Sequence, residues 1–221
     1  MFQNDLVGIL VVYSYVAILL LISEKLLKNH PIFGRKFLHI MTGNIAFILP
    51  IFQTKEIMAF VAAFPFIILT YLMSKHSPIE KIRGKTSAAG HGMGLVYYAI
   101  SWTILAYLFF DNKLIIAVGI LAMSYGDGFA SLLGLRFGKR KFDIFDNKKS
   151  YIGSFSMFIF SLIFLNIAIL FYDFTINIEI ILILIVISIC AMVTEIITPK
   201  GLDNLTVPFL TSIYFYFAFI I

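Results

Sequence analysis

The chain has 221 residues, of which 61% are hydrophobic and only 13% charged, and its mean hydropathy is +0.98. A soluble domain of this length has too little interior to hide so much apolar surface. The composition therefore excludes a soluble globular protein and indicates a polytopic membrane protein. The net charge of +5 does not indicate a nucleic-acid partner, because the cations are grouped between apolar stretches. The single cysteine, Cys190, excludes an intramolecular disulfide.

Eight apolar stretches follow one another along the chain, and we expect each of them to be a membrane helix. Several are short for a hydrocarbon layer of about 30 Å, so tilted, broken or partly re-entrant helices are expected. The predicted fold is all-α, a polytopic transmembrane helical bundle of about 7–8 spans, with residues 1–221 as a single domain. The stretches cover approximately residues 5–24, 37–53, 56–73, 92–110, 114–134, 153–172, 176–194 and 204–221.

The distribution of Lys and Arg predicts the orientation. The loops after the first, third, fifth and seventh stretches hold 4, 4, 6 and 1 of the 17 Lys and Arg residues. Lys55 and Lys113 fall on the other face. By the positive-inside rule, the four basic loops are cytoplasmic and both termini lie outside. We therefore expect a multi-pass integral membrane protein whose basic face, and any site on it, faces the cytoplasm.

The strongest functional signal is a carboxylate inside an apolar stretch. Asp127 lies between Gly126 and Gly128 in the fifth stretch. A charged side chain at the centre of a membrane helix costs about 3 kcal/mol on insertion scales, so a cation or a water-filled cavity is expected beside it. The flanking glycines let another backbone or a ligand approach closely. Gly126, Ala130 and Gly134 recur every four residues, a small-residue stripe that favours close helix packing.

A dense basic segment follows this stretch. Six cations lie within residues 136–149, interleaved with glycines. Ammonium groups and flexible backbone N–H groups both stabilise anionic oxygens, so the segment favours a polyphosphate ligand. Attraction to anionic lipid headgroups is the alternative, and the neighbouring carboxylate argues for the polyphosphate. The candidate residues are Arg136, Lys139, Arg140, Lys141, Lys148, Ser150, Gly153 and Ser154.

Two further acids flank a helix break near the end of the chain. Pro199 and Gly201 end one helix, with Glu195 before the break and Asp203 after it. Asp203 is placed to cap the next helix, and Glu195 to pair with a basic loop residue, so each has a structural alternative. Because Asp127, Glu195 and Asp203 lie on the same cationic face, we predict that they hold Mg²⁺, with water and phosphate completing an octahedron.

Another polar cluster opens the second stretch. Arg35 and His39 are four residues apart and share a helix face. Lys36 is either an interfacial anchor or a nucleotide contact. His39 is either a buried histidine satisfied by a backbone carbonyl or a group that handles a proton. The candidate catalytic residues are therefore Asp127, His39 and Arg35.

Four sequence elements, in this order, resemble the phytol kinase and dolichol kinase family, and they span about residues 35–208. Ile152 stands where dolichol kinases commonly have an acidic residue, which together with the short length places the chain nearer the phytol kinase branch. The elements are Arg35-Lys36-x-x-His39-x-x-x-Gly43, Gly126-Asp127-Gly-x-Ala130-Ser131-x-x-Gly134-x-Arg136-Phe137-Gly138, Lys148-Lys149-Ser150-x-x-Gly153-Ser154-x-x-Met157-Phe158, and Glu195 with Asp203-Asn204-Leu-Thr206-Val-Pro208.

The resemblance implies an integral membrane kinase that transfers a phosphoryl group from CTP to an isoprenoid alcohol such as phytol, geranylgeraniol, farnesol or a longer polyprenol. Mg²⁺ on Asp127, helped by Asp203 or Glu195, would bridge the nucleotide phosphates, and Asn204 and Lys36 would join the basic residues around the nucleotide. The alcohol's proton would pass to His39 or Asp127. A carboxylate already on Mg²⁺ is the poorer base, which favours His39.

The expected partners are CTP, the isoprenoid alcohol and the lipid bilayer; no nucleic acid is expected and no oligomer is indicated. A CTP-dependent diacylglycerol kinase is an alternative with the same fold. A cytidylyltransferase that makes a CDP-lipid is less favoured, because no second paired-aspartate signature is visible. A small transporter with Asp127 and Glu195 as coupling sites is also less favoured, because the chain shows no two similar halves.

Overall fold

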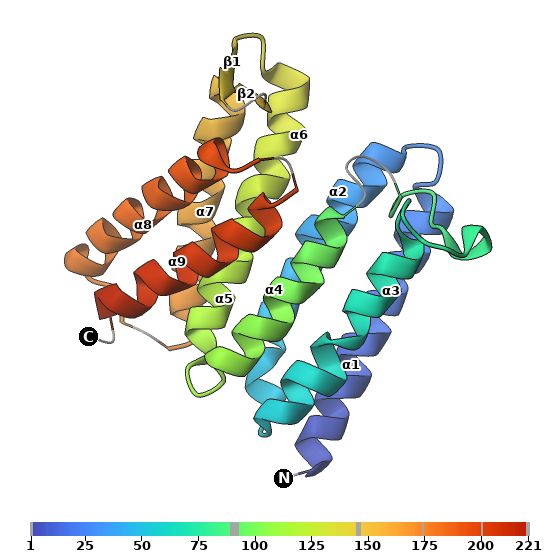
Figure 1. Cartoon of the computed structure of the whole chain (residues 1–221). Helices are drawn as coiled ribbons and strands as arrows, with labels where there is room; N and C mark the ends of the chain where they lie inside the picture. The colour runs from blue at the N-terminus through green and yellow to red at the C-terminus, as the bar shows by residue number, and fades with distance from the viewer. Residues whose placement is uncertain (1, 89–92, 145–146, 174, 200, 220–221) are drawn as a thin grey trace. The chain divides into compact units, whose positions relative to one another are not determined.

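The computed structural model describes residues 2–88, 93–144, 147–173, 175–199 and 201–219. The chain forms two compact units, Met1–Lys113 and Leu114–Ile221 (Figure 1). Within the described ranges, each of the eight predicted apolar stretches forms a helical segment, so the all-α prediction is confirmed. Whether the two units act as the single predicted domain stays a prediction.

Four helices in the described part are long and apolar enough to cross a membrane. Two further apolar helices, Ile57–Met73 and Gly94–Leu108, are shorter. The chain is therefore a membrane protein by its helices as well as by its composition, while the count of seven or eight spans stays a prediction. The four long helices are Gln3–Leu26, Lys113–Phe137, Tyr151–Phe171 and Ile178–Ile197.

In the first unit, prolines set where helices begin. Pro31 and Pro65 each stand at the first helical position, where the fixed φ and the missing N–H of proline are tolerated. The helical segments are α1 (Phe2–Leu21), a π-helical turn (Ile22–Leu26), α2 (Pro31–Thr42), two 3₁₀ turns (Gly43–Phe47 and Leu49–Ile51), a π-helical segment (Ile57–Ala63), α3 (Pro65–Met73), a 3₁₀ turn (Glu80–Ile82) and α4 (Gly94–Leu108). The second stretch is thus a broken helix, as expected.

Polar side chains fix α1 against its neighbours along its whole length. The Asp5 carboxylate accepts hydrogen bonds from the backbone N–H groups of Gln53 (2.8 Å) and Thr54 (3.1 Å) and from the Thr54 hydroxyl (2.7 Å). Halfway along, the Tyr15 hydroxyl donates to the Met41 carbonyl oxygen at 2.7 Å. Hydrogen bonds inside an apolar environment are stronger than in water, so these contacts set the axial position of α1.

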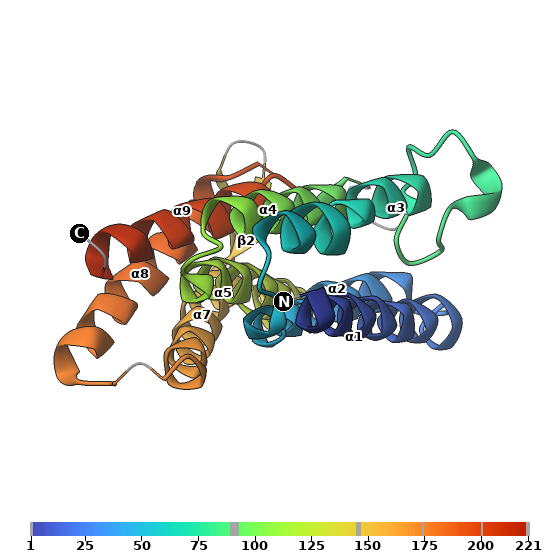
Figure 2. The same cartoon turned by 90° about the horizontal axis from the view of Figure 1, so that it is seen from below.

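At the other end of α1, the Glu24 carboxylate holds the turn that precedes α4. It accepts hydrogen bonds from the backbone N–H groups and the hydroxyls of Thr86 and Ser87. A side chain at Gly84 would overlap the Glu24 carboxylate. Figure 2 shows the result as two helix layers in this unit, α1 with α2 and α3 with α4.

The second unit is built on one continuous helix, residues 113–137. In the most apolar 18-residue part of this helix, 89% of the residues are buried. Helices α7 and α9 both pack against it, and α8 packs against α7 and α9. The elements are α5 (Lys113–Leu121), a π-helical segment (Ala122–Asp127), α6 (Gly128–Phe137), β1 (Lys141–Ile144), β2 (Asn147–Ser150), α7 (Tyr151–Phe171), α8 (Ile178–Ile197) and α9 (Asp203–Phe219).

The small-residue stripe packs as predicted. A side chain at Gly126 would overlap Ser161 and Met157 of α7. One turn on, the Ala130 carbonyl oxygen lies 3.0 Å from the place of a Cβ at Gly153. The stripe therefore lets α6 and α7 approach backbone to backbone, which places the start of α7 beside the end of α6.

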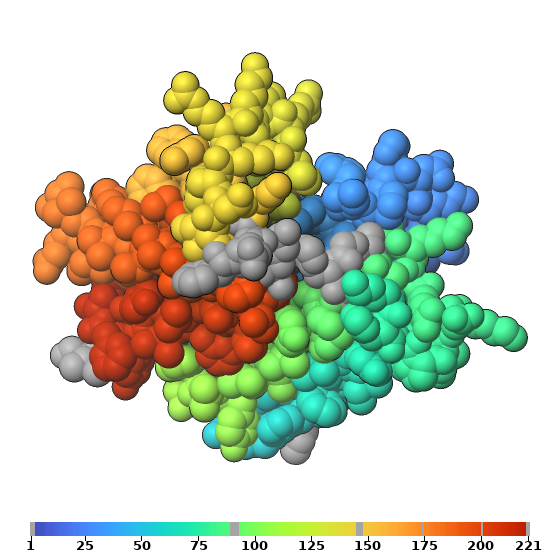
Figure 3. Space-filling view, turned by 45° about the horizontal axis from the view of Figure 1, so that its top comes forward, coloured from blue at the N-terminus to red at the C-terminus, as the bar shows by residue number. Residues whose placement is uncertain are grey.

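The basic segment after α6 is a β-hairpin, which we did not predict. Strands β1 and β2 pair antiparallel, with Phe142 opposite Lys149 and Asp143 opposite Lys148. Figure 3 shows this region (yellow) standing out from the surface of the unit. The segment was predicted as a basic loop because its apolar alternation is too short and too interrupted by charge to indicate a strand.

Candidate functional site

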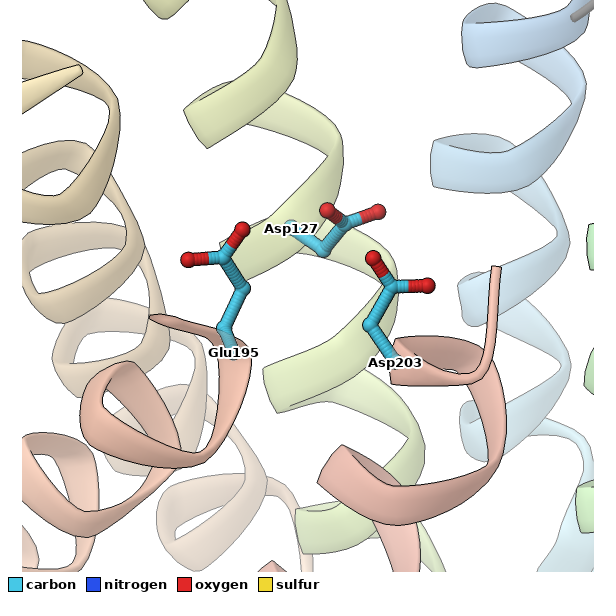
Figure 4. Close-up of side chains that lie close together, drawn as sticks. All are labelled: Asp127, Glu195 and Asp203. Atoms are coloured by element: carbon cyan, nitrogen blue, oxygen red, sulfur yellow. The ribbon is translucent and has the colours of Figure 1, made fainter. Parts of the chain in front are cut away.

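Three carboxylates from separate elements converge in the second unit. Asp127 is the last residue of the π-helical segment, Glu195 lies in the last turn of α8, and Asp203 begins α9 (Figure 4). One oxygen from each lies within 4.8 Å of the others. Asp127 and Glu195 are 6% and 5% exposed, so two of the three acids are buried. Burial of this much negative charge is costly unless a cation compensates it.

The π-helical segment delivers Asp127 to this cluster. A π-helical turn inside an α-helix adds a residue to the turn and is frequent at functional sites. Here the segment Ala122–Asp127 separates α5 from α6 and ends at the acid itself. The glycine before it, Gly126, admits α7 on the side facing Ser161.

The turn between α8 and α9 brings the other two acids together. Gly201 has φ 88°, a left-handed conformation that side chains rarely adopt, which explains why glycine stands there. The Thr198 hydroxyl donates to the Thr194 carbonyl and lies 2.9 Å from the Thr206 hydroxyl, which ties the end of α8 to the first turn of α9. Without this reversal of chain direction, the carboxylates of Glu195 and Asp203 would lie far apart in space.

Asp203 also contacts the first turn of its own helix. One of its carboxylate oxygens accepts a hydrogen bond from the backbone N–H of Asn204 at 2.9 Å. The neighbouring amide of Asn204 is buried, and its Nδ2 lies 3.4 Å from the Gly201 carbonyl oxygen. This bond goes to the next residue and not to the second or third N–H of the helix that an N-cap accepts from, so the capping role stays a prediction, while Asp203 does belong to the acid cluster.

A lysine that the sequence did not single out completes the cluster. The Lys149 ammonium forms an ion pair with the Glu195 carboxylate, and the two side chains are 13% and 6% exposed. Burial lowers the pKa of Lys149, but the carboxylates of Glu195, Asp203 and Asp127 together raise it by a larger amount. Its pKa therefore lies above the ordinary value. Lys149 therefore carries a proton at neutral pH and neutralises part of the acid charge.

The hairpin decides which lysine reaches the acids. Successive side chains of a strand point to opposite faces, so Lys148 and Lys149 face opposite ways. Lys148 is exposed and lies opposite Asp143, whereas Lys149 is drawn in by Glu195. Alternation along a strand is the signal that would have identified Lys149, had the hairpin been expected. The other predicted cations of the segment are exposed: Arg136, Lys139, Arg140 and Lys141.

The start of α7 lies directly beyond this lysine. Ser150 is the N-cap, and its hydroxyl accepts a hydrogen bond from the Gly153 backbone N–H at 3.1 Å. Ser154, in the first turn, is 8% exposed, and its hydroxyl has no hydrogen-bond partner among the described residues. A helix N-terminus presents backbone N–H groups and positive potential, which stabilise anions. The predicted residues Ser150, Gly153 and Ser154 are therefore together at an anion-favouring helix end.

The predicted residues of the second stretch lie on α2, in the first unit. His39 is buried at 4% exposure, and its ring meets the ring of Tyr98 edge to face, with 5.0 Å between centroids. Arg35 and Lys36 precede it on the same helix and are partly exposed. Their catalytic and nucleotide-binding roles stay predictions.

The acid cluster fits a magnesium ion. Mg²⁺ prefers oxygen ligands at about 2.1 Å, so oxygens that share one octahedral ion lie about 3 to 4 Å apart. The three acids lie within 4.8 Å of one another, so small side-chain rotations bring them into that range. Asp127, Glu195 and Asp203 would hold such an ion, and one ammonium beside three carboxylates leaves room for more positive charge.

Comparison with known proteins places the chain among lipid-alcohol kinases. Phytol kinase of Synechocystis sp. is 31% identical over 179 residues, covering 79% of this chain and 74% of that protein. Phytol kinase 1, chloroplastic, of Arabidopsis thaliana is 31% identical over 222 residues, which cover 91% of this chain and 72% of that protein. The probable phytol kinase, chloroplastic, of Triticum aestivum is 32% identical over 157 residues, which cover 66% of this chain and 51% of the Triticum protein.

No family model and no solved structure matches the chain. The resemblance therefore rests on whole sequences, and it includes the stretch that holds the acid cluster, since the alignment with the probable phytol kinase 2, chloroplastic, of Glycine max, 28% identical, covers 94% of the chain. Because 31% identity extends over most of both sequences, the chain belongs to the phytol kinase family.

Proposed function

We propose that this chain is a membrane kinase that transfers the γ-phosphoryl group of CTP to the hydroxyl of an isoprenoid alcohol and releases CDP and the lipid monophosphate. The observation that carries the proposal is the convergence of Asp127, Glu195 and Asp203 on one point, with Lys149 beside them, in a member of the phytol kinase family. The relatives' names supply the alcohol, and the acid cluster supplies the means to bind a nucleotide polyphosphate.

Phosphoryl transfer needs positioning and charge neutralisation more than covalent participation by the protein. Mg²⁺, when bound, would be held by Asp127, Glu195 and Asp203 and would neutralise charge on the nucleotide phosphates. Asp127 and Glu195 hold their carboxylates in a buried setting, where electrostatic attraction is stronger than in water. Lys149 stays protonated because its pKa is raised, so it supplies a fixed positive charge for anionic oxygens.

The start of α7 and the hairpin would hold the rest of the nucleotide phosphates. The N-terminal turn of α7 contributes backbone N–H groups, and the buried Ser154 hydroxyl is available there as a donor. The exposed cations contribute long-range attraction for a multiply charged anion. These cations are Arg136, Lys139, Arg140, Lys141 and Lys148.

A basic group must accept the proton of the alcohol. We propose His39, because a carboxylate that binds a cation is a weaker base than a neutral imidazole. His39 is buried, so competing water is scarce around it. We further propose that the basic segments face the cytoplasm, where CTP is available, and that the chain crosses the bilayer seven or eight times.

The direct test is a panel of nucleotides and alcohols on purified protein in detergent with Mg²⁺. We expect labelled phosphate from CTP to enter phytol or geranylgeraniol, with CDP as the second product. Transfer to diacylglycerol alone would replace the isoprenoid alcohol as substrate. Release of pyrophosphate would indicate cytidylyl transfer. Lipid or ion flux in proteoliposomes without nucleotide turnover would indicate a transporter.

The acid cluster is tested by Asp127→Asn, with Asp143→Asn as the matched control, because Asp143 is an exposed acid on the hairpin of the same unit. We expect Asp127→Asn to lose at least about a hundredfold in rate, since losing even a residue that only orients a metal ligand costs 10- to 100-fold. Binding of Mn²⁺, followed by its paramagnetic resonance signal, should weaken in the same variant. Unchanged activity and Mn²⁺ binding would remove Asp127 from the site.

A further inference from the structure

The first unit contains a large apolar cavity between its two helix layers. The space that the centre of a water-sized sphere can occupy in it is about 80 Å³, several times the roughly 10 to 15 Å³ that a single water molecule needs. All four helices contribute to the wall, among them Val16 of α1, Leu38 of α2, Leu69 of α3 and Ala99 of α4. The layers that enclose it are visible in Figure 2. Protein interiors leave few voids larger than a water molecule, so a cavity of this size is a candidate ligand site.

The wall offers almost no polar chemistry. Two of its threonines donate their hydroxyls to their own helix, Thr42 to the Leu38 carbonyl at 2.7 Å and Thr70 to the Phe66 carbonyl at 2.6 Å. The Ser87 hydroxyl donates to Glu24 at 2.7 Å. The Nε1 of Trp102, also on the wall, is buried and has no hydrogen-bond partner among the described residues. Because the other donors are already used and the rest of the wall is almost entirely apolar, the cavity favours a hydrocarbon ligand over a polar one.

The cavity has a polar end and an apolar end. The hydrogen bonds of α1 fix the direction, since Asp5 lies level with Thr54 and Glu24 lies level with Ser87. Along α4, the wall runs from Leu95 to Ala106, which is a rise of about 16 Å along the helix axis. Lys55 lies over the ring of Tyr107, so the Ala106 end of α4 is level with the Thr54 end of α1.

The polar end is the place for an alcohol group. Tyr98 lines the cavity near this end and meets the ring of His39 edge to face. Ser87 lies at this end and donates its hydroxyl to the Glu24 carboxylate. At the opposite end, the wall consists of Phe52, Met58 and Ala106, which offer no partner to a hydroxyl.

We propose that this cavity binds the hydrocarbon chain of the isoprenoid alcohol, with the hydroxyl at the Ser87 end and the tail against Ala106 and Met58. The identity of the ligand rests on the proposed function; the place of its chain does not. Isoprenoid chains are flexible, apolar and methyl-branched, and alanines at positions 62, 63, 99 and 106 leave the wall recessed where branches must fit. The cavity length then selects chain length.

Binding is measured without nucleotide, so the test is independent of kinase activity. Trp102 is the single tryptophan of the chain and lines the cavity. Phytol brominated near the end of its hydrocarbon chain quenches tryptophan fluorescence on contact. We expect saturable quenching that unlabelled phytol and geranylgeraniol reverse, and that the shorter alcohol geraniol reverses poorly. Absence of saturable quenching, or reversal by diacylglycerol but not by phytol, would overturn the assignment.

Chain-length selection is tested at the apolar end. Ala106→Phe fills this end, and Ile104→Phe on the same helix is the matched control, because Ile104 is 39% exposed and not part of the wall. We expect Ala106→Phe to weaken phytol binding about tenfold while geraniol binding stays unchanged, and Ile104→Phe to change neither. Met58→Ala enlarges the same end and should shift preference toward longer polyprenols.

The outcomes separate this inference from the proposed function. Normal quenching by brominated phytol with no nucleotide turnover would keep the chain site and refute the kinase. Phosphorylation of phytol with chain-length profiles that are the same in the wild type, Ala106→Phe and Met58→Ala would keep the kinase and refute the chain site. Thermal unfolding of each variant, followed at Cys190 with a thiol-reactive dye, shows that a lost signal is not lost folding.

Discussion

Removing the Lys149 ammonium should destabilise the protein in a way that magnesium repairs. The perturbation is Lys149→Met, which keeps an apolar stem of similar length but deletes the charge that pairs with Glu195. Breaking a buried ion pair by removing one partner typically costs about 3 to 5 kcal/mol, because the remaining charge is left uncompensated. The side chains of this pair are 13% and 6% exposed, so screening by solvent reduces that cost little.

The spacing of the acids gives a second measure of the cost. Two carboxylates 4.8 Å apart repel each other by about 3.5 kcal/mol at an effective dielectric constant of about 20. With Lys149 removed, Glu195 must bear this repulsion from Asp127 and Asp203 or take up a proton. Magnesium supplies the missing positive charge, so we expect Mg²⁺ to stabilise Lys149→Met more than it stabilises the wild type.

The assay is thermal unfolding in detergent, with and without Mg²⁺, followed by dye labelling of the single cysteine, Cys190. A loss of 3 to 5 kcal/mol corresponds to a fall of about 6 to 20 °C in Tm for a chain of this size. The matched control is Lys148→Met, the neighbouring exposed lysine on the other strand face, which should change stability by less than about 0.5 kcal/mol. Equal shifts in the two variants, or no greater recovery with Mg²⁺ in Lys149→Met, would refute the reasoning.

Three other measurements test the fold and the site. Gly119→Ala should lower the free energy of unfolding by about 1 to 3 kcal/mol, and by more than Gly126→Ala does. The reason is that a Cβ at Gly119 overlaps the Pro208 backbone carbonyl, whereas one at Gly126 meets movable side-chain ends. Equal melting temperatures of the two variants would contradict this packing. The stabilising effect of Lys149, taken as the difference between wild type and Lys149→Met, should be constant between neutral pH and pH 10.5 and fall as the pH rises through the raised pKa; a fall that begins near neutral pH would mean that the pKa is lowered. Reporter fusions in the segment 135–150 should report a cytoplasmic location, and an external location would separate the acid cluster from CTP.

The helices were predictable because hydropathy alone marks them. Each apolar stretch became a helical segment in the described part of the chain, and the resemblance to the phytol kinase family was confirmed by whole-sequence identity. The helix breaks were predictable where a residue type enforces them, as at Gly201 with its left-handed backbone. The π-helical segment that ends at Asp127 was not, because a single extra residue in a turn leaves no trace in an apolar pattern.

The acid cluster was predictable as a set, but its electrostatics were not. The shared cationic face was enough to group Asp127, Glu195 and Asp203, which are far apart in sequence, and the structure brings them together. The expected pairing of Glu195 with a basic residue is also present, which shows that the structural and ligand-binding interpretations of an acid are compatible. A buried carboxylate needs a counter-charge, and Lys149 supplies it.

The choice between Lys148 and Lys149 shows where composition stops being informative. In a loop the two lysines are equivalent, and charge density is all that matters. In a strand they point to opposite faces, so a shift of one residue in the pairing of β1 with β2 would exchange them. Ser150 as the N-cap of α7 and the close approach of Gly138 to it fix that register. The position of one helix cap therefore decides which cation meets the acids, and that information lies in the packing of α6 against α7.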